Sequence, residues 1–209
     1  MGSSLLDVRE LTVNQQRIFP AVTVGFDVLD ASGVVLGSFV QVGRDNLDKT
    51  LHPRADDATT ALGAKLGVAP NRAYLLTPFE LRSSTGDVVL HVILSNDTKK
   101  RLFVCEPDNT EIGRICRENL FGKPRLSLEI AGVKAGAITV SDRRRKSWVV
   151  SDAAQRETGR IEMTQGSSGD FTDVNNYAVH LASDLGAAVR WLTLASVFAI
   201  DLILWQRHG

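Results

Sequence analysis

The segment from Trp191 to Trp205 (WLTLASVFAIDLILW) is apolar on every side and carries a single acidic residue, Asp201. A helix that is apolar all round has to be surrounded, either by lipid or by protein. Which of the two surrounds this segment decides what kind of protein the chain forms. The rest of the sequence therefore has to supply either a membrane anchor or a protein shell.

Four segments upstream repeat one pattern, in which an aromatic residue and an apolar run lead into a polar turn and a second apolar run. They are Phe26–Gly37, Phe79–Leu90, Phe103–Gly113 and Trp148–Gly159. Turn sequences such as Asp-Ala-Ser-Gly and Pro-Asp-Asn-Thr supply tight or left-handed conformers at the right place. The series therefore predicts successive hairpins of one antiparallel sheet.

The same alternation continues between these segments, so that we expect about twelve strands in all. They are predicted near residues 10–18, 22–30, 34–42, 74–83, 87–95, 100–106, 111–118, 125–131, 134–141, 145–152, 158–164 and 176–182. The segment 47–71 departs from the pattern, because it is polar and Ala-rich and contains Pro53 and Pro70. We interpret it as an excursion loop with one or two helical turns around residues 57–66.

Strands with one apolar face must bury that face. A closed sheet of about twelve strands has an interior wider than its own side chains easily fill. A helix over residues 186–206 would be roughly 30 Å long at about 1.5 Å per residue, and it is the apolar element left to occupy that space. We therefore predict a mainly β fold, a closed antiparallel barrel around a central C-terminal helix, with residues 1–209 as one domain.

The alternative for the apolar segment is a single transmembrane span. Its strongly apolar residues contribute about −4 kcal/mol to insertion, whereas Asp201 costs roughly 2.5–3.5 kcal/mol near the bilayer centre. The run is also shorter than the roughly 20 residues that a span needs, and Arg190 and Arg207 flank it. Inside a barrel each buried apolar side chain contributes about 1.5–3 kcal/mol. We favour the core helix and keep the span as the alternative.

Composition restricts the partners and the compartment. The net charge of the 209 residues is zero, so electrostatic binding must come from local patches and we expect no nucleic-acid partner. The N-terminus shows no signal peptide and no myristoylation motif, since Leu6 stands where Ser or Thr is needed. Cys105 and Cys116 fall on two arms of one predicted hairpin, too many residue pairs apart for a disulfide. Free thiols without a signal indicate the cytoplasm.

The stretch from Phe171 to Asp184 (FTDVNNYAVHLASD) leads directly into the apolar segment. In order and spacing the two together resemble the C-terminus of the phospholipid scramblase family, in which an FTDADNF-like stretch precedes a turn, an Asp and a hydrophobic helix with an internal Ile-Asp pair. The matching positions are Phe171, Thr172, Asp173, Asn176, Tyr177, Asp184, Phe198, Ile200 and Asp201. The resemblance implies the barrel shared by the scramblase, Tubby C-terminal and LURP-one-like families.

The resemblance also implies a calcium-binding segment, with Asp173, Asn175 and Asp184 at the family's ligand positions. Calcium prefers a cage of oxygen ligands that is rich in carboxylates. Here Asn175 replaces an acid, and no bidentate acid follows at EF-hand spacing. The alternative is that these residues cap turns, with Asp184 as the N-cap of the helix. Calcium is thus a candidate ligand.

Two basic runs fall at predicted turns that precede a strand. Near an anionic membrane each Lys or Arg contributes about 1 kcal/mol to binding, and Tubby-like domains bind phosphoinositides through basic residues. The alternative is a pair of solvated hairpin turns. The candidate lipid-binding residues are Lys99, Lys100, Arg101, Arg143, Arg144, Arg145 and Lys146.

We expect no enzyme, because the sequence contains no Walker, Rossmann, HExxH or GxSxG pattern and its four histidines are scattered. The resemblance implies a scramblase-like protein that interacts with anionic phospholipids or a membrane surface, by energy-independent translocation of phospholipids between leaflets. The alternative is a non-enzymatic Tubby-like module that binds phosphoinositides or a protein. The expected location is the cytoplasm, at the inner face of the plasma membrane.

Overall fold

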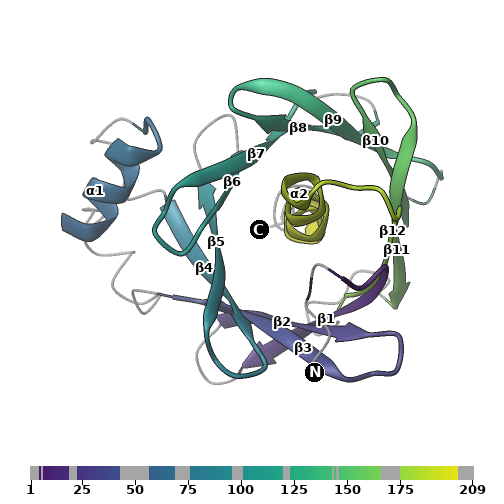
Figure 1. Cartoon of the computed structure of the whole chain (residues 1–209), viewed down its shortest axis with the longest axis horizontal. Helices are drawn as coiled ribbons and strands as arrows, with labels where there is room; N and C mark the ends of the chain where they lie inside the picture. The colour runs from purple at the N-terminus through teal and green to yellow at the C-terminus, as the bar shows by residue number, and fades with distance from the viewer. Residues whose placement is uncertain are drawn as a thin grey trace.

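The computed structural model describes residues 5, 7–18, 23–42, 57–68, 76–95, 101–119, 123–142, 144, 146–165 and 175–201. This part of the chain contains twelve strands and two helices (Figure 1). The strands are β1 (Glu10–Ile18), β2 (Thr23–Asp30), β3 (Val35–Gln41), β4 (Leu76–Ser83), β5 (Val88–Ser95), β6 (Arg101–Cys105), β7 (Glu111–Arg117), β8 (Arg125–Ile130), β9 (Val133–Val140), β10 (Ser147–Asp152), β11 (Glu157–Gln165) and β12 (Asn176–Leu181). The helices are α1 (Asp57–Lys65) and α2 (Ala187–Phe198).

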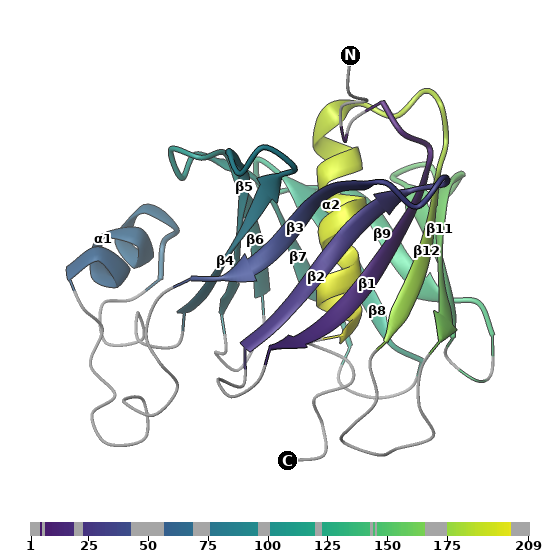
Figure 2. The same cartoon turned by 90° about the horizontal axis from the view of Figure 1, so that it is seen from below.

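The strands described here form one closed antiparallel barrel in sequence order, which β1 and β12 complete by pairing with each other. Helix α2 runs along the barrel axis (Figures 1 and 2). The predicted fold class is therefore confirmed, a Tubby C-terminal-like barrel around a C-terminal helix. Every predicted strand limit agrees with the structure to within two residues, because apolar alternation and turn chemistry mark the same boundaries.

Because the strands are antiparallel, successive strand connections lie alternately at the two ends of the barrel. The short turns β2–β3, β4–β5, β6–β7, β8–β9 and β10–β11 lie at one end, which we call the hairpin end. Strands β6, β8 and β10 begin at the opposite end, which we call the loop end. Helix α2 enters the barrel at the hairpin end and runs toward the loop end (Figure 2).

All five hairpins at the hairpin end contain a shift in strand register. In four of them a glycine pairs with the residue just before the shift: Gly37, Gly113, Gly136 and Gly159. A Cβ atom on Gly136 would lie 2.3 Å from the carbonyl oxygen of Ser151 on β10. A register shift increases the local twist and brings the neighbouring strand close. Glycine leaves room for this close approach because it has no Cβ atom. Three of these glycines end a repeated segment of the sequence.

Helix α2 forms the centre of the hydrophobic core. From Arg190 to Asp201 every residue of the helix and of the wider π-type turn that follows it is buried. The ring of Phe198 packs against those of Phe26 and Phe39, with centroids 4.3 and 4.1 Å away, and also contacts Phe79. The predicted core helix is thus confirmed, with burial from Arg190 to Asp201, whereas Ala187 at its start is exposed. Residues 202–206 of the predicted helix lie outside the described part.

Among the described residues, no helix combines the length and the apolarity needed to cross a bilayer.

The start of α2 corrects one prediction. Asp184 is exposed in the turn between β12 and α2, and the N-cap position belongs to Gly186, whose capping involves no side chain. The chain leaves β12 at the barrel wall and needs further residues to reach the axis. Leu185 packs against the core on the way in, so the helix begins two residues later than an Asp184 cap would allow.

Helix α1 covers a small second cluster on the outside of the barrel. Leu62 lies in α1, and Leu66 and Val68 follow it; they pack against Ile93 and Phe103 on β5 and β6, together with Cys105. The predicted excursion around residues 57–66 is helical, and it buries the outer faces of β5 and β6. In Figure 1 α1 stands outside the barrel wall.

Replacing Phe198 by Ala should cost roughly 3–5 kcal/mol of unfolding free energy, because the cavity left among three phenylalanine rings cannot collapse. Urea unfolding followed by circular dichroism measures this cost. Val133→Ala is the matched control, since Val133 is 71% exposed, and it should change stability little. A loss below about 1 kcal/mol for Phe198→Ala would show that the position is not in a packed core.

Replacing Gly136 by Ala should destabilise the protein by roughly 1–3 kcal/mol, because the new methyl group overlaps a backbone carbonyl that cannot move without shifting β10. Gly186→Ala is the control, since a Cβ there meets no atom within 4 Å. Thermal unfolding of both variants would compare them. Equal melting temperatures would contradict the close approach of the strands.

Candidate functional site

A buried polar cluster lies at the loop-end side of the barrel interior, around the carboxylate of Asp201. The π-type turn after α2 directs Asp201 toward β1 and β12, where it is only 6% exposed. Its Oδ1 accepts hydrogen bonds from the Tyr177 hydroxyl (3.0 Å) and the Asn175 amide (2.7 Å). Its Oδ2 accepts one from Nε2 of Gln15 (3.2 Å). Inserting this carboxylate into a bilayer would cost free energy, whereas inside the barrel it accepts hydrogen bonds from three side chains.

The cluster joins three segments that are distant in sequence. Asn175 and Gln15 are also bonded to each other, since the backbone N–H of Asn175 donates to Oε1 of Gln15 (2.9 Å). Burial, reinforced by the negative charge of Asp201, raises the pKa of Tyr177 well above its ordinary value. Tyr177 therefore stays a neutral donor, and the cluster contains no activated nucleophile or base among these three partners.

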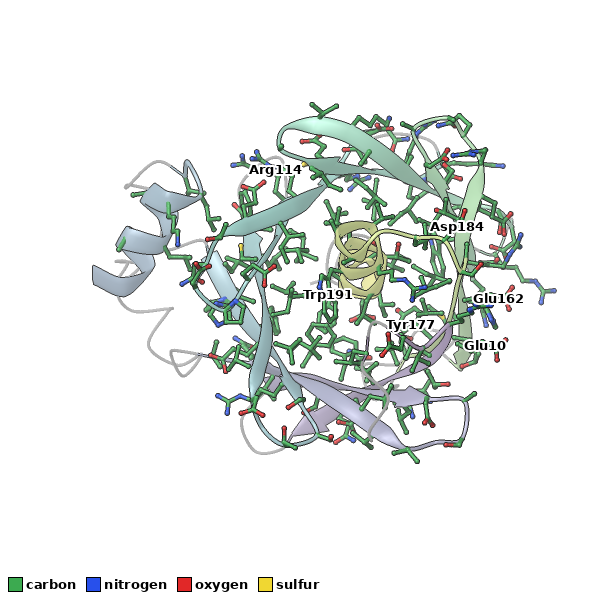
Figure 3. The ribbon with its side chains drawn as sticks, in the orientation of Figure 1. Glu10, Arg114, Glu162, Tyr177, Asp184 and Trp191 are labelled. Carbon is green, nitrogen blue, oxygen red and sulfur yellow. The ribbon has the colours of Figure 1, made fainter. Side chains whose placement is uncertain are left out.

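A second polar anchor holds the other end of α2. Arg190, in the first turn, is buried and its guanidinium donates to backbone carbonyl oxygens of Val8, Ala182, Ser183 and Leu185 at 3.3–3.5 Å. Arg190 and Asp201 are separated by about three helical turns, so they lie on one face of the helix. That face points at the pairing of β1 with β12, and Figure 3 shows Tyr177 directed into the barrel toward the helix.

The predicted calcium ligands are not brought together. Asp173 lies outside the described residues. Asn175 precedes β12 and uses its amide for Asp201, whereas Asp184 follows β12 at the hairpin end, roughly 20 Å away along a six-residue strand. The described residues also contain no group of three His, Cys, Asp or Glu side chains that could hold a metal ion. Asn175 and Asp184 therefore do not fit a common calcium ion.

The two basic runs both reach the loop end of the barrel. Arg101 begins β6, and its guanidinium lies 5.4 Å from the centroid of the Phe103 ring. Arg144 and Lys146 are exposed in the turn before β10, where Oδ1 of Asp142 accepts the backbone N–H groups of Lys146 (2.8 Å) and Ser147 (3.1 Å). The other predicted lipid-binding residues, Lys99, Lys100, Arg143 and Arg145, lie outside the described part.

Sequence reasoning missed further basic residues at the same end. Lys123 is exposed just before β8, and Arg125 begins that strand in an ion pair with Glu118 (2.6 Å). Neither belongs to a dense run, so neither stood out in the sequence. Their shared signal is position, because each precedes or begins an even-numbered strand and so falls at the loop end. The sequence also gave no signal for Gln15, which bonds to Asp201, or for Arg190, which holds the first turn of α2.

The two cysteines are free thiols, as predicted. Cys105 pairs across the hairpin with Glu111, and Cys116 pairs with Arg101, so they occupy different residue pairs. Burial raises the pKa of Cys105 to about 12 and that of Cys116 to about 11. Both thiols are therefore protonated at neutral pH, which makes them poor nucleophiles.

Comparison with known proteins supports the fold. The chain is similar to the X-ray structure of a protein from Arabidopsis thaliana, with a TM-score of 0.51, 12% sequence identity and coverage of 97% of this chain and 99% of that chain. No family model and no curated protein matches the chain. At this identity the similarity shows the fold alone, and the scramblase resemblance rests on the motif residues.

Replacing Tyr177 by Phe should cost about 1.5–3 kcal/mol near neutral pH, because it removes a donor to a buried carboxylate. The raised pKa of Tyr177 means that its protonated form stabilises the fold fully below the unfolded-state pKa of about 10. Above that pH the contribution is lost at up to about 1.4 kcal/mol per pH unit. The Phe variant lacks this titration, so the difference between the two proteins should shrink as pH rises.

Urea unfolding of both proteins between about pH 8 and pH 11 measures that difference. A stability difference that stays constant over this range would show that Tyr177 ionises as readily in the folded protein as in the unfolded one.

Proposed function

We propose that this protein is a non-catalytic module that binds anionic phospholipids at a membrane surface through its two basic runs. The proposal rests on one observation: the apolar helix and the exposed basic residues occupy different parts of the structure. The apolar helix fills the barrel, while Arg144 and Lys146 stand exposed in a turn whose shape Asp142 sets through backbone hydrogen bonds. Preset, exposed cations are the groups that an anionic headgroup attracts.

Lipid translocation between leaflets is the second candidate, and the scramblase-like motif favours it. Two residues of that motif, Tyr177 and Asp201, are hydrogen-bonded to each other, so part of the motif is accounted for by helix anchoring. Translocation by the helix would require α2 to leave a core in which it is buried from Arg190 to Asp201. We therefore rank binding above translocation. A Tubby-like module that binds a protein is the remaining alternative.

One reconstitution experiment distinguishes these functions. The full chain is mixed with phosphatidylcholine vesicles, with and without phosphatidylserine or a phosphoinositide, and binding is measured by co-sedimentation. The same vesicles, carrying a headgroup-labelled lipid, report translocation by dithionite reduction, with and without calcium. Binding that needs anionic lipid but gives no translocation supports the module. Translocation would support the second candidate, and absence of binding to every vesicle would overturn the proposal.

Replacing Arg143, Arg144, Arg145 and Lys146 together by Ser should weaken binding to anionic vesicles by at most about 4 kcal/mol, at about 1 kcal/mol per charge. The loss should shrink as salt rises, because exposed charges are screened. Folding should change by only a few tenths of a kcal/mol, since exposed turn charges contribute little to stability. A folded quadruple variant with unchanged affinity at low salt would remove this run from the binding surface.

A further inference from the structure

The hairpin end of the barrel carries a set of ionised aspartates. Asp30, Asp108 and Asp152 each sit at a turn, and each carboxylate accepts backbone N–H groups of its own turn at 2.7–2.9 Å. Hydrogen bonds lower the pKa of all three carboxyls; the largest contribution comes from the hydroxyl of Ser32 at Asp30, the hydroxyl of Thr110 at Asp108 and the backbone N–H of Arg156 at Asp152. A fourth, Asp87, accepts the hydroxyl of Thr85 in the β4–β5 turn (2.7 Å). Four of the five turns therefore carry an aspartate, and at one of them Arg156 offsets the charge of Asp152 through an ion pair.

The loop end carries the opposite charge in the described residues. Lys123, Arg144 and Lys146 are exposed there, and Arg101 begins β6 at the same end. The acids nearby are engaged: Glu118 forms an ion pair with Arg125, and Asp142 accepts backbone N–H groups. The net charge of the chain is zero, and the described residues show a difference in charge between the two ends of the barrel, although Arg9 and Arg156 are exposed bases at the hairpin end.

The length of the barrel makes this polarity matter. Strands of five to nine residues, tilted in a barrel, separate the two ends by roughly 15–25 Å. At physiological ionic strength the Debye length is about 8 Å, so a charged surface acts mainly on the end that touches it. Because the net charge is zero, it neither attracts the whole protein to a charged surface nor repels it. The charge of the end that touches the surface then decides which end approaches it.

We propose that the barrel meets an anionic membrane end-on, with its loop end against the lipid headgroups and its hairpin end toward the solution. This inference rests on the proposed lipid binding and adds the contact face. The bases before β8 and β10 and at the start of β6 face the same surface, and the turn aspartates are held away from it. Helix α2 stands along the membrane normal and stays in the core.

The hairpin end offers a competing orientation. Val34, Val35 and Val133 are exposed there by 57%, 43% and 71%, and apolar tips can insert between lipid headgroups. Asp30 lies in the same turn as Val34, accepting its backbone N–H at 2.9 Å. Insertion of this turn would bring a carboxylate against an anionic surface. Charge therefore favours the loop end, and hairpin-end insertion is the result that would overturn the proposal.

Two variants with the same change in net charge test the orientation. Arg144→Ser with Lys146→Ser removes two charges at the loop end, and Arg9→Ser with Arg156→Ser removes two exposed charges at the hairpin end. The first pair should weaken binding to phosphatidylserine-containing vesicles by up to about 30-fold. The second should change it by less than about twofold, because those charges lie beyond the Debye length. Equal losses, or a larger loss for the second pair, would overturn the end-on contact.

A depth measurement supplies an independent readout. In a chain with Cys105→Ala and Cys116→Ser, a fluorophore is attached at Ser141→Cys beside the loop end or at Val133→Cys at the hairpin end. A lipid-borne quencher should quench the first label on binding and leave the second unchanged. Quenching of the Val133 label alone would establish the reverse orientation, and equal quenching a side-on one. If the parent chain binds no anionic vesicle, the proposed function itself fails, whereas binding with the wrong label quenched rejects only the orientation.

Discussion

The structure depends on how α2 is fixed to the pairing of β1 with β12. Every other strand pair joins neighbours in sequence, but this pair joins the first and the last of the described strands and closes the barrel. Arg190 bonds to carbonyls next to both strands at the hairpin end, and Asp201 bonds to Gln15 and Tyr177 within them. The helix therefore fastens the closure at both ends of its length, with polar groups that lose their partners if the helix shifts by one turn.

This fastening explains why an apolar helix contains two charged residues. Dispersion and hydrophobic burial hold α2 inside the barrel, but they are non-directional and would tolerate rotation or sliding. Buried polar groups are costly unless their partners are met in one geometry. Arg190 and Asp201 therefore fix the rotation and the depth of the helix. Phe198 then falls between the rings of Phe26 and Phe39, which makes the packing depend on the polar anchors.

The fold was predictable from the sequence because its elements have local signals. Alternating apolar and polar residues indicate the strands, and turn residues indicate where they end. A segment that is apolar on every side but too short to span a membrane indicates a helix surrounded by protein. The site was less predictable, because Asp201 meets Gln15 across 186 residues and Asn175 across 26, and no local pattern encodes such pairs. The predicted N-cap at Asp184 was wrong for a similar reason. The position at which the helix starts depends on the path from the barrel wall to its axis, which no local pattern encodes.

The polarity of the barrel has two origins, and only one of them follows from the fold. Tight turns favour Asp because its carboxylate accepts the turn's own N–H groups, as at Asp30 and Asp152. An antiparallel barrel with five such turns at one end therefore becomes acidic there for structural reasons. Nothing in turn chemistry requires exposed bases such as Arg144 and Lys146 at the other end. A chain can neutralise acidic turns locally, as Arg156 does beside Asp152, so the exposed bases at the loop end are the part of the charge pattern that calls for a function.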